Sequence, residues 1–468
     1  MKKGLIIQIR IESAAFEGRG YGKIDGYSVF VPNTAPGDLA EIQIIKKKSK
    51  YAEARLLRIL ESGEKRIQAK CEHAEVCGGC SWQHLPYSEQ IIFKSKHVED
   101  HVRRIGGLTD VPVHKALAAE QEFAYRNKME FSFGDRRWLT NEEIQSNEHI
   151  PSEGFFAGMH APGRFDRILH LNECYLMEPY AFEMLAFTRN FALAHALEPY
   201  NPVKHTGLLR NLMIRNSYHT NDLMVNLVTN SENEDIVELW KIELLQKFPM
   251  ITTITQNVND TNSPISVGRY EKVLFGLGYI RDSIGEYQFT IHPNAFFQTN
   301  TKQAEILYET ALKFADNKEG DLIYDLYCGV GTLTLFLSKK ASKVIGIELN
   351  PVAITNARQN AEFNKVLNVE FELGDMKDTF NEPLLAKYGI PDVIVTDPPR
   401  AGMHPDVIKQ LMELKVKKIV YVSCNSSTMA RDLSVLKSVY HVNQIQPVDM
   451  FPQTYHIESV AELLLISE

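Results

Sequence analysis

The clearest candidate for covalent chemistry is a cysteine at the end of a predicted strand. The β-rich segment KIVYVS leads into Cys424, and the small polar residues after it (NSST) predict a turn that enters a helix. Backbone dipoles at a helix N-terminus lower the pKa of a thiol and favour the thiolate, which is a ready nucleophile. A lone cysteine is usually part of a core, but this context favours Cys424 as a nucleophile.

Two carboxylates accompany this cysteine. The segment DVIVTDPPR ends a predicted strand with Asp397, and HIESVAELL places Glu458 directly before a final strand. Ligands of open α/β sheets bind at the carboxyl ends of the parallel strands, so we expect Asp397 to line that edge and a loop to deliver Glu458 to it. The plainer alternative is that both are turn or helix-cap residues.

A glycine turn upstream predicts a cofactor site. In DLYCGVGTLTL, Gly329 and Gly331 follow a predicted strand and precede a helix, where glycine lets the backbone approach a ligand. Thr334 stands where a dinucleotide fingerprint would have its third glycine, which favours a cofactor without phosphates. The next strand ends in Glu348, whose carboxylate can accept hydrogen bonds from ribose hydroxyls, and Asp375 follows the third strand. The pattern indicates an adenosine-type cofactor.

Four further cysteines suit a metal centre. Three have the spacing C-x5-C-x2-C and the fourth lies far downstream: Cys71, Cys77, Cys80 and Cys174. Four thiolates fit tetrahedral zinc or an iron-sulfur cluster, and the chemistry alone leaves both open. The spacing differs from the C-x3-C-x2-C of radical S-adenosylmethionine enzymes, so no redox catalysis is assigned.

The elements that must position these residues fall into three parts. Short β-rich runs from Leu5 to Leu60, broken by Gly and Pro turns, predict a small N-terminal barrel, which we place at residues 1–62. A mixed, β-rich central domain with helices near 180–195 and 234–247 is predicted for 68–90 and 124–276.

Strands alternate with helices from Asp321 onwards, which predicts an α/β Rossmann-like domain with a doubly wound, mostly parallel sheet. We assign residues 91–123 and 277–468 to it, and the first of these ranges includes most of an amphipathic helix predicted over Tyr87–Ile105.

Composition favours an ordinary globular protein with one basic end. The chain has 468 residues, 44% hydrophobic and 24% charged, which argues against disorder. The net charge is -8, yet residues 1–70 carry +6, a surface that can attract a polyanion or simply be solvated. No signal-like segment and no run of 18 apolar residues occurs, so we expect a cytoplasmic protein without a membrane span, and a monomer.

The order of DPPR, SCN and the HIE segment resembles the RNA uracil-5-methyltransferase family. IHPNAFFQTN, which contains Gln298, and GLLRNLMIR (207–215) are similar to further motifs of that family, and the N-terminal barrel resembles its TRAM-type RNA-binding domain. The resemblance touches nearly the whole chain.

The resemblance implies transfer of a methyl group from S-adenosylmethionine to carbon 5 of a uridine in RNA. Cys424 would add to carbon 6 and Glu458 would remove the carbon 5 proton, while Gln298, Tyr327, Glu348 and Asp397 would contact the cofactor. Cys71, Cys77, Cys80 and Cys174 would hold the 4Fe-4S cluster of the ribosomal-RNA members, with Cys328 structural. The resemblance favours 23S rRNA as the substrate and leaves tRNA as an alternative. The target uridine would be single-stranded or flipped out of its stack.

Three alternatives remain at this point. Amino-group methylation through the DPP segment would not need Cys424. DNA cytosine-5 methylation uses a thiolate that normally follows proline, whereas Ser423 precedes Cys424 here. A non-catalytic RNA-binding protein would need only the barrel and its basic stretch.

Overall fold

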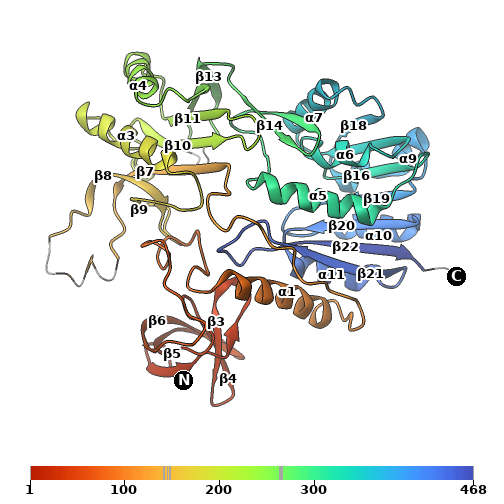
Figure 1. Cartoon of the computed structure of the whole chain (residues 1–468), viewed down its shortest axis with the longest axis horizontal. Helices are drawn as coiled ribbons and strands as arrows, with labels where there is room; N and C mark the ends of the chain where they lie inside the picture. The colour runs from red at the N-terminus through yellow and green to blue at the C-terminus, as the bar shows by residue number, and fades with distance from the viewer. Residues whose placement is uncertain (1, 141–142, 145, 147–148, 263–266, 467–468) are drawn as a thin grey trace.

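The computed structural model describes residues 2–140, 143–144, 146, 149–262 and 267–466. Figure 1 shows three bodies: a barrel-like sheet at the N-terminal end, a central sheet with two helices, and a larger α/β body that carries the C-terminal half. The loop between the last two strands points from the α/β body toward the place where the three bodies meet.

The N-terminal body is a six-stranded sheet in the order β1-β5-β6-β4-β3-β2. Alternation along β5 buries every second side chain, and Val29, Val31, Ile42 and Ile44 form its apolar core. This agrees with the predicted small barrel. Its strands are β1 (Ile6–Arg10), β2 (Ser13–Ala14), β3 (Gly20–Ile24), β4 (Tyr27–Val31), β5 (Leu39–Lys47) and β6 (Tyr51–Glu61).

The central body is a seven-stranded sheet in the order β13-β12-β11-β10-β7-β8-β9. Only β11 and β12 pair in parallel within it, and α3 (Tyr180–Ala194) and α4 (Glu234–Lys247) share its core through Leu185 and Trp240. The strands are β7 (Lys128–Arg136), β8 (Glu153–His160), β9 (Ile168–His170), β10 (Leu209–Asn216), β11 (Leu223–Thr229), β12 (Thr253–Val258) and β13 (Tyr270–Phe275).

The α/β body contains a seven-stranded sheet in the order β18-β17-β16-β19-β20-β22-β21. All neighbours are parallel except β22, which runs antiparallel to β20 and β21. The predicted doubly wound, mostly parallel sheet is therefore present. Its strands are β16 (Leu322–Leu326), β17 (Lys343–Glu348), β18 (Val369–Leu373), β19 (Val393–Thr396), β20 (Lys418–Ser423), β21 (Tyr440–Val448) and β22 (Glu458–Leu465).

Helices cover this sheet on both faces, and two separate hydrophobic cores lie on its two sides. A two-stranded hairpin, β14 (Ile280–Ile284) and β15 (Tyr287–Ile291), precedes the first covering helix. The helices are α5 (Thr301–Ala315), α6 (Thr332–Leu337), α7 (Pro351–Phe363), α8 (Met376–Thr379), α9 (Glu382–Tyr388), α10 (Pro405–Leu414) and α11 (Ser426–Leu436).

An N-terminal segment completes the α/β body. Helix α1 (Tyr87–Arg104) buries Ile91, Val98 and Val102 in one of its two cores and packs beside α11. The chain then runs along β21, where Val113 and Leu117 form isolated bridges. The three-domain division proposed from the sequence stays a prediction in its residue limits. Among the described helices, none is both long and apolar enough to cross a membrane.

Candidate active site

The carboxyl ends of the parallel strands open into one cavity of about 2120 Å³. It collects every catalytic and cofactor residue predicted from the sequence, together with Asp375. The four clustered cysteines are not among the described residues that line it, although Gly78 and Gly79 of the same segment are. The predicted residues on its wall are Gln298, Tyr327, Glu348, Asp397, Cys424 and Glu458.

The glycine turn between β16 and α6 forms one end of this cavity. Gly329 has φ of +55° and nothing within 4 Å of the position where a Cβ would stand, so its backbone faces open space. At Gly331, with φ of +80°, an added Cβ would come within 3.0 Å of the Phe371 ring. The turn therefore presents bare backbone to the cavity, as a close-fitting small-molecule site requires.

Glu348 is fixed against that turn. The Gly329 N–H donates to its Oε2 at 3.1 Å, and the Asn350 N–H donates to its Oε1 at 2.8 Å. Each carboxylate oxygen has a second lone pair, so the group can still accept hydrogen bonds from two neighbouring hydroxyls. Its position at the end of β17 and on the cavity wall suits the ribose of an adenosine-type cofactor.

Asp325 is a wall residue that the sequence prediction missed. The Thr334 hydroxyl donates to its Oδ2 at 2.6 Å, while its buried Oδ1 has no hydrogen-bond partner among the described residues. Burial, together with Asp397 and Glu348, raises the pKa of Asp325 to about 7. Its place at the end of β16, three residues before the cysteine of the glycine turn, was the available signal.

Cys424 lies on the turn between β20 and α11. Asn425 caps the helix by accepting from the Ser427 N–H at 3.1 Å, and its Nδ2 donates to the Arg400 carbonyl at 3.2 Å, which ties the SCN and DPPR segments together. The thiol is half-buried and faces the same cavity as Asp397 and Glu458.

The prediction that the helix N-terminus lowers the pKa of Cys424 is wrong. Burial, followed by the charges of Glu458 and Asp397, raises this pKa to about 11, and the hydrogen-bonding Arg400 guanidinium opposes the rise. Burial is the largest cause because it disfavours the charged thiolate, and the two acids that share the cavity add to it. Arg400, which sequence analysis noted only as the end of DPPR, is the nearby group that favours a thiolate.

Glu458 begins β22 and is 6% exposed. Burial and the neighbouring Asp397 raise its pKa to about 8, although Arg400 acts in the opposite direction. Burial also raises the pKa of Asp397 to about 6. An acid with a pKa near neutrality can both hold and accept a proton at physiological pH, which suits it to general acid-base work.

The loop between β21 and β22 carries Glu458, and a buried ion pair holds this loop. Lys94 Nζ of α1 lies 2.6 Å from Asp449 Oδ1, and both side chains are 0% exposed. Lys94 also donates to the Phe451 carbonyl at 3.0 Å, and the Tyr87 hydroxyl donates to Asp449 Oδ2 at 2.9 Å.

A second set of bonds ties the same loop to the segment that contains the clustered cysteines. The Ser81 and Trp82 N–H groups both donate to the Gln453 carbonyl, at 2.9 and 3.1 Å. Gln453 adopts a left-handed φ of 69°, and Gln90 of α1 accepts from its N–H at 2.9 Å. The base-bearing loop is thus held from two directions.

Replacement of Asp449 should destabilise the protein strongly. Asp449→Asn leaves the Lys94 ammonium buried without a counter-ion, so we expect the free energy of unfolding to fall by about 3 kcal/mol or more. Urea denaturation followed by tryptophan fluorescence measures this change. Glu99→Gln, which breaks the exposed pair with Arg103 on the same helix, should cost less than about 1 kcal/mol. Equal costs for both variants would contradict the role given to the buried pair.

The four clustered cysteines lie on two neighbouring segments. All four are free and half-buried. Burial and, to a lesser extent, the charges of the other thiols raise the pKa of Cys71 to about 11 and that of Cys80 to about 12. Their mutual influence fits a common thiolate site, yet within the described ranges no three His, Cys, Asp or Glu residues are arranged as a metal-binding group.

The fold is that of a Rossmann-like methyltransferase, as shown by the strand order, the single antiparallel strand and the glycine turn. Cys424, in a cavity with several acids, is a potential nucleophile. Residues 217–466 match the family described as tRNA (Uracil-5-)-methyltransferase, and residues 2–57 match the TRAM domain. The chain therefore belongs to the RNA uracil-5-methyltransferase family and is an S-adenosylmethionine-dependent RNA methyltransferase.

Relatives support this membership along the full length. An uncharacterized RNA methyltransferase of Bacteroides thetaiotaomicron is 42% identical over 96% of this chain and 100% of its own, and one of Chlorobaculum tepidum is 40% identical over 98% and 96%. The crystal structure of the Pyrococcus abyssi tRNA (uracil-54, C5)-methyltransferase in complex with S-adenosyl-L-homocysteine superposes with a TM-score of 0.73 at 29% identity, covering 98% of this chain and 100% of that one.

Proposed function

We propose that the protein methylates carbon 5 of a uridine in RNA through a covalent Cys424 adduct. The observation that carries the proposal is the joint placement of Cys424 and Glu458 on one cavity that the Gly329 turn also lines. Family membership supports the reaction class, and the cavity supports the residue roles.

Uracil explains why a nucleophile is needed. Carbon 5 is too weak a nucleophile to take a methyl group from a sulfonium, so the Cys424 thiol first gives up its proton to solvent, its sulfur bonds to carbon 6 and the ring becomes an enolate. Carbon 5 of that enolate then accepts the methyl group. Glu458 removes the proton from carbon 5, and its electron pair re-forms the ring double bond as the sulfur leaves carbon 6.

Four residues are proposed to hold the cofactor, S-adenosylmethionine. Glu348 would accept from the ribose hydroxyls, and Asp397 follows β19, the strand between β16 of the cofactor turn and β20 of Cys424. Gln298 and Tyr327 would contact it from the loop before α5 and the end of β16. The unpartnered oxygen of Asp325 adds a fifth acceptor that the cationic cofactor can use.

The RNA target is proposed by resemblance. The cysteine spacing together with the barrel favours 23S rRNA, whereas the tRNA substrate named for the Pyrococcus abyssi enzyme makes tRNA the alternative. The uridine must be unpaired or flipped out, because pairing and stacking hide the ring from a cavity of this kind. The protein is expected to act as a cytoplasmic monomer.

We also propose that Cys71, Cys77, Cys80 and Cys174 bind a 4Fe-4S cluster with a structural role. The clustering of their thiols supports this, but the ligand geometry is not formed in the described residues. Zinc remains the alternative, and iron and sulfide analysis of anaerobically purified protein separates the two.

The function is tested by incubating the protein with labelled S-adenosylmethionine and bulk RNA from cells that lack it, followed by nucleoside mass spectrometry. Label in 5-methyluridine of 23S rRNA supports the whole proposal, and label in tRNA keeps the chemistry but changes the substrate. Label in an N-methylated nucleoside would overturn the proposed chemistry.

The basic edge of the barrel gives a separate prediction. A triple variant with Lys46→Gln, Lys47→Gln and Lys48→Gln should bind RNA more weakly. The slope of log affinity against log salt should fall by about 2, because each phosphate contact contributes about 0.7 for single strands. Fluorescence anisotropy over a salt series measures both. A triple variant of Lys247, Lys313 and Lys318, which are also exposed, is the control. An unchanged slope would show that the barrel lysines are only solvated.

A further inference from the structure

Three aromatic rings form a continuous row from the barrel to the active-site cavity. Phe16 lies on the turn between β2 and β3, and its ring meets the edge of Tyr455 with centroids 5.6 Å apart. Tyr455 lies over His456 at 4.2 Å with an interplanar angle of 34°. His456 lines the cavity that also contains Cys424 and Glu458. The row therefore connects the barrel with the catalytic residues.

All three rings are half-buried, so they keep part of their surface open to solvent. Phe16 is held by edge contacts with His101 at 4.8 Å and His97 at 6.1 Å on α1. The backbone is also close, since a Cβ on Gly18 would lie 3.4 Å from the Tyr455 ring. Phe16 thus anchors the row at the barrel, and Tyr455 and His456 continue it to the cavity wall.

Positive charge accompanies these rings. Arg400 and Arg126 both line the cavity and act electrostatically on His456. Burial, followed by these cations, lowers the pKa of His456 to about 4, so its ring is neutral at physiological pH. Neutral rings with flanking guanidinium groups match an unpaired polynucleotide, which presents base faces and phosphates in alternation.

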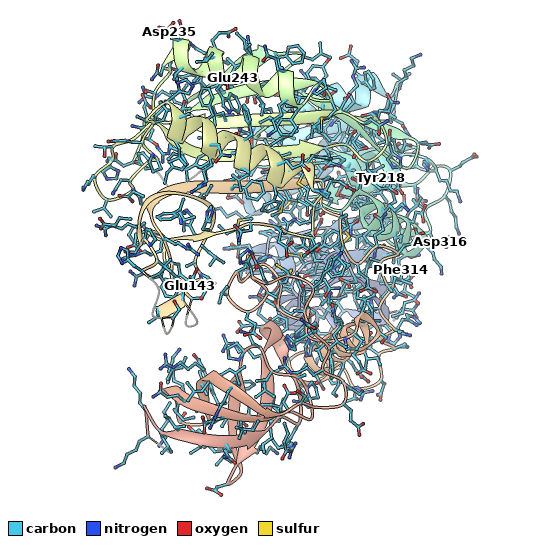
Figure 2. All side chains as sticks on the ribbon, turned by 60° about the vertical axis from the view of Figure 1, so that its left-hand side comes forward. Glu143, Tyr218, Asp235, Glu243, Phe314 and Asp316 are labelled. Atoms are coloured by element: carbon cyan, nitrogen blue, oxygen red, sulfur yellow. The ribbon has the colours of Figure 1, made fainter. Side chains whose placement is uncertain are left out.

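The charge at the opposite end of the molecule is consistent with a polynucleotide that approaches from the barrel side. Figure 2 shows Asp235 and Glu243 on α4 at the end of the molecule opposite the barrel, where a polyanion would be repelled. The aromatic row lies instead where the barrel meets the cavity, and residues 1–70 of the chain, which include the barrel, carry a net charge of +6.

We propose that Phe16, Tyr455 and His456 form a stacking platform for the unpaired bases that flank the target uridine. The barrel and the cavity then bind one continuous single strand, with Tyr455 stacking on a base between them. The proposal rests on the proposed function for RNA as the substrate, but it concerns binding and not methyl transfer.

The test compares Tyr455→Ala with Tyr218→Ala. Tyr218 also precedes a histidine, and the centroids of the two rings are 4.9 Å apart. It is 40% exposed and is not among the residues that line the cavity. Two fluorescent probes are used without cofactor: a 12-residue oligouridylate, and a sugar-phosphate oligomer of equal length without bases. Anisotropy gives the affinity of each protein for each probe.

We expect Tyr455→Ala to bind the oligouridylate about tenfold more weakly, the loss of one stacked base, while its affinity for the base-free oligomer stays unchanged. Tyr455→Phe should restore tight binding, because it keeps the ring. Tyr218→Ala should match the wild type with both probes. If Tyr455→Ala unfolds, Tyr455→Leu keeps the bulk without the aromatic face and should show the same tenfold loss.

The proposal is overturned if the variant without the ring binds oligouridylate as tightly as the wild type, or if both probes lose affinity equally. The result is separable from the proposed function. If Tyr455→Ala loses base-dependent binding but the wild type methylates no uridine, the platform is supported and the proposed reaction is rejected. If the wild type methylates uridine but Tyr455→Ala binds both probes normally, the reaction is supported and the platform is rejected.

Discussion

Cys424→Ala should abolish both methyl transfer and the covalent capture of RNA, a loss of at least about 10³-fold, while cofactor binding is retained. The thiol is the candidate nucleophile on the cavity wall, and alanine cannot form the bond to carbon 6 of uracil. Capture is measured as a protein-RNA band on denaturing electrophoresis with 5-fluorouridine-substituted RNA, in which the adduct cannot lose a proton from carbon 5.

Cofactor affinity of the same variant, measured by calorimetry, serves as the control for its folding. Turnover that survives in Cys424→Ala would remove the thiol from the mechanism and favour amino-group methylation through the DPPR segment. The hypothesis of a non-catalytic binding protein predicts no capture even in the wild type, so the wild-type band distinguishes it.

Glu458→Gln should allow methyl transfer but slow product release by at least about 10²-fold, because glutamine cannot take the proton from carbon 5. A methylated protein-RNA adduct should therefore accumulate with ordinary RNA, visible on denaturing gels within one turnover. Glu462→Gln is a control on the same strand, since Glu462 is bonded to Asn443 and lies outside the cavity lining. Rapid release by Glu458→Gln would exclude Glu458 as the base.

The pH dependence of release provides a second check. The pKa of Glu458 is raised to about 8, so its deprotonated, basic form becomes more populated as pH rises from 7 to 9. Release by the wild type should become faster over this range, and Glu458→Gln should lack that increase. A wild-type rate that falls as pH rises would have the wrong sign for a carboxylate base.

Strand ends explain why much of the site could be predicted from the sequence. Glu348 ends a predicted parallel strand, and Asp397 and Cys424 directly follow two others. Topology alone brings such positions to one edge. Glu458 could be placed because it begins the last strand. The alternating pattern after Asp321 was equally direct evidence for the sheet.

The electrostatics could not be predicted because they depend on contacts between distant residues. The helix dipole at Cys424 is a local feature, but the pKa of its thiol is raised by burial in the folded chain and then by acids from two other segments. The orphan oxygen of Asp325 and the ion pair of Lys94 with Asp449 likewise exist only in the folded chain. A sequence pattern carries no information about which buried groups lack partners.

The buried pair of Lys94 and Asp449 also bears on how the enzyme forms during synthesis. The two residues are 355 positions apart, so on a growing chain α1 emerges long before the partner of its ammonium exists. Closing so large a loop is entropically costly and tends to occur late in folding. We expect the base-bearing loop to be among the last parts to order, so that a nascent chain with its barrel already folded can bind RNA before it can modify it.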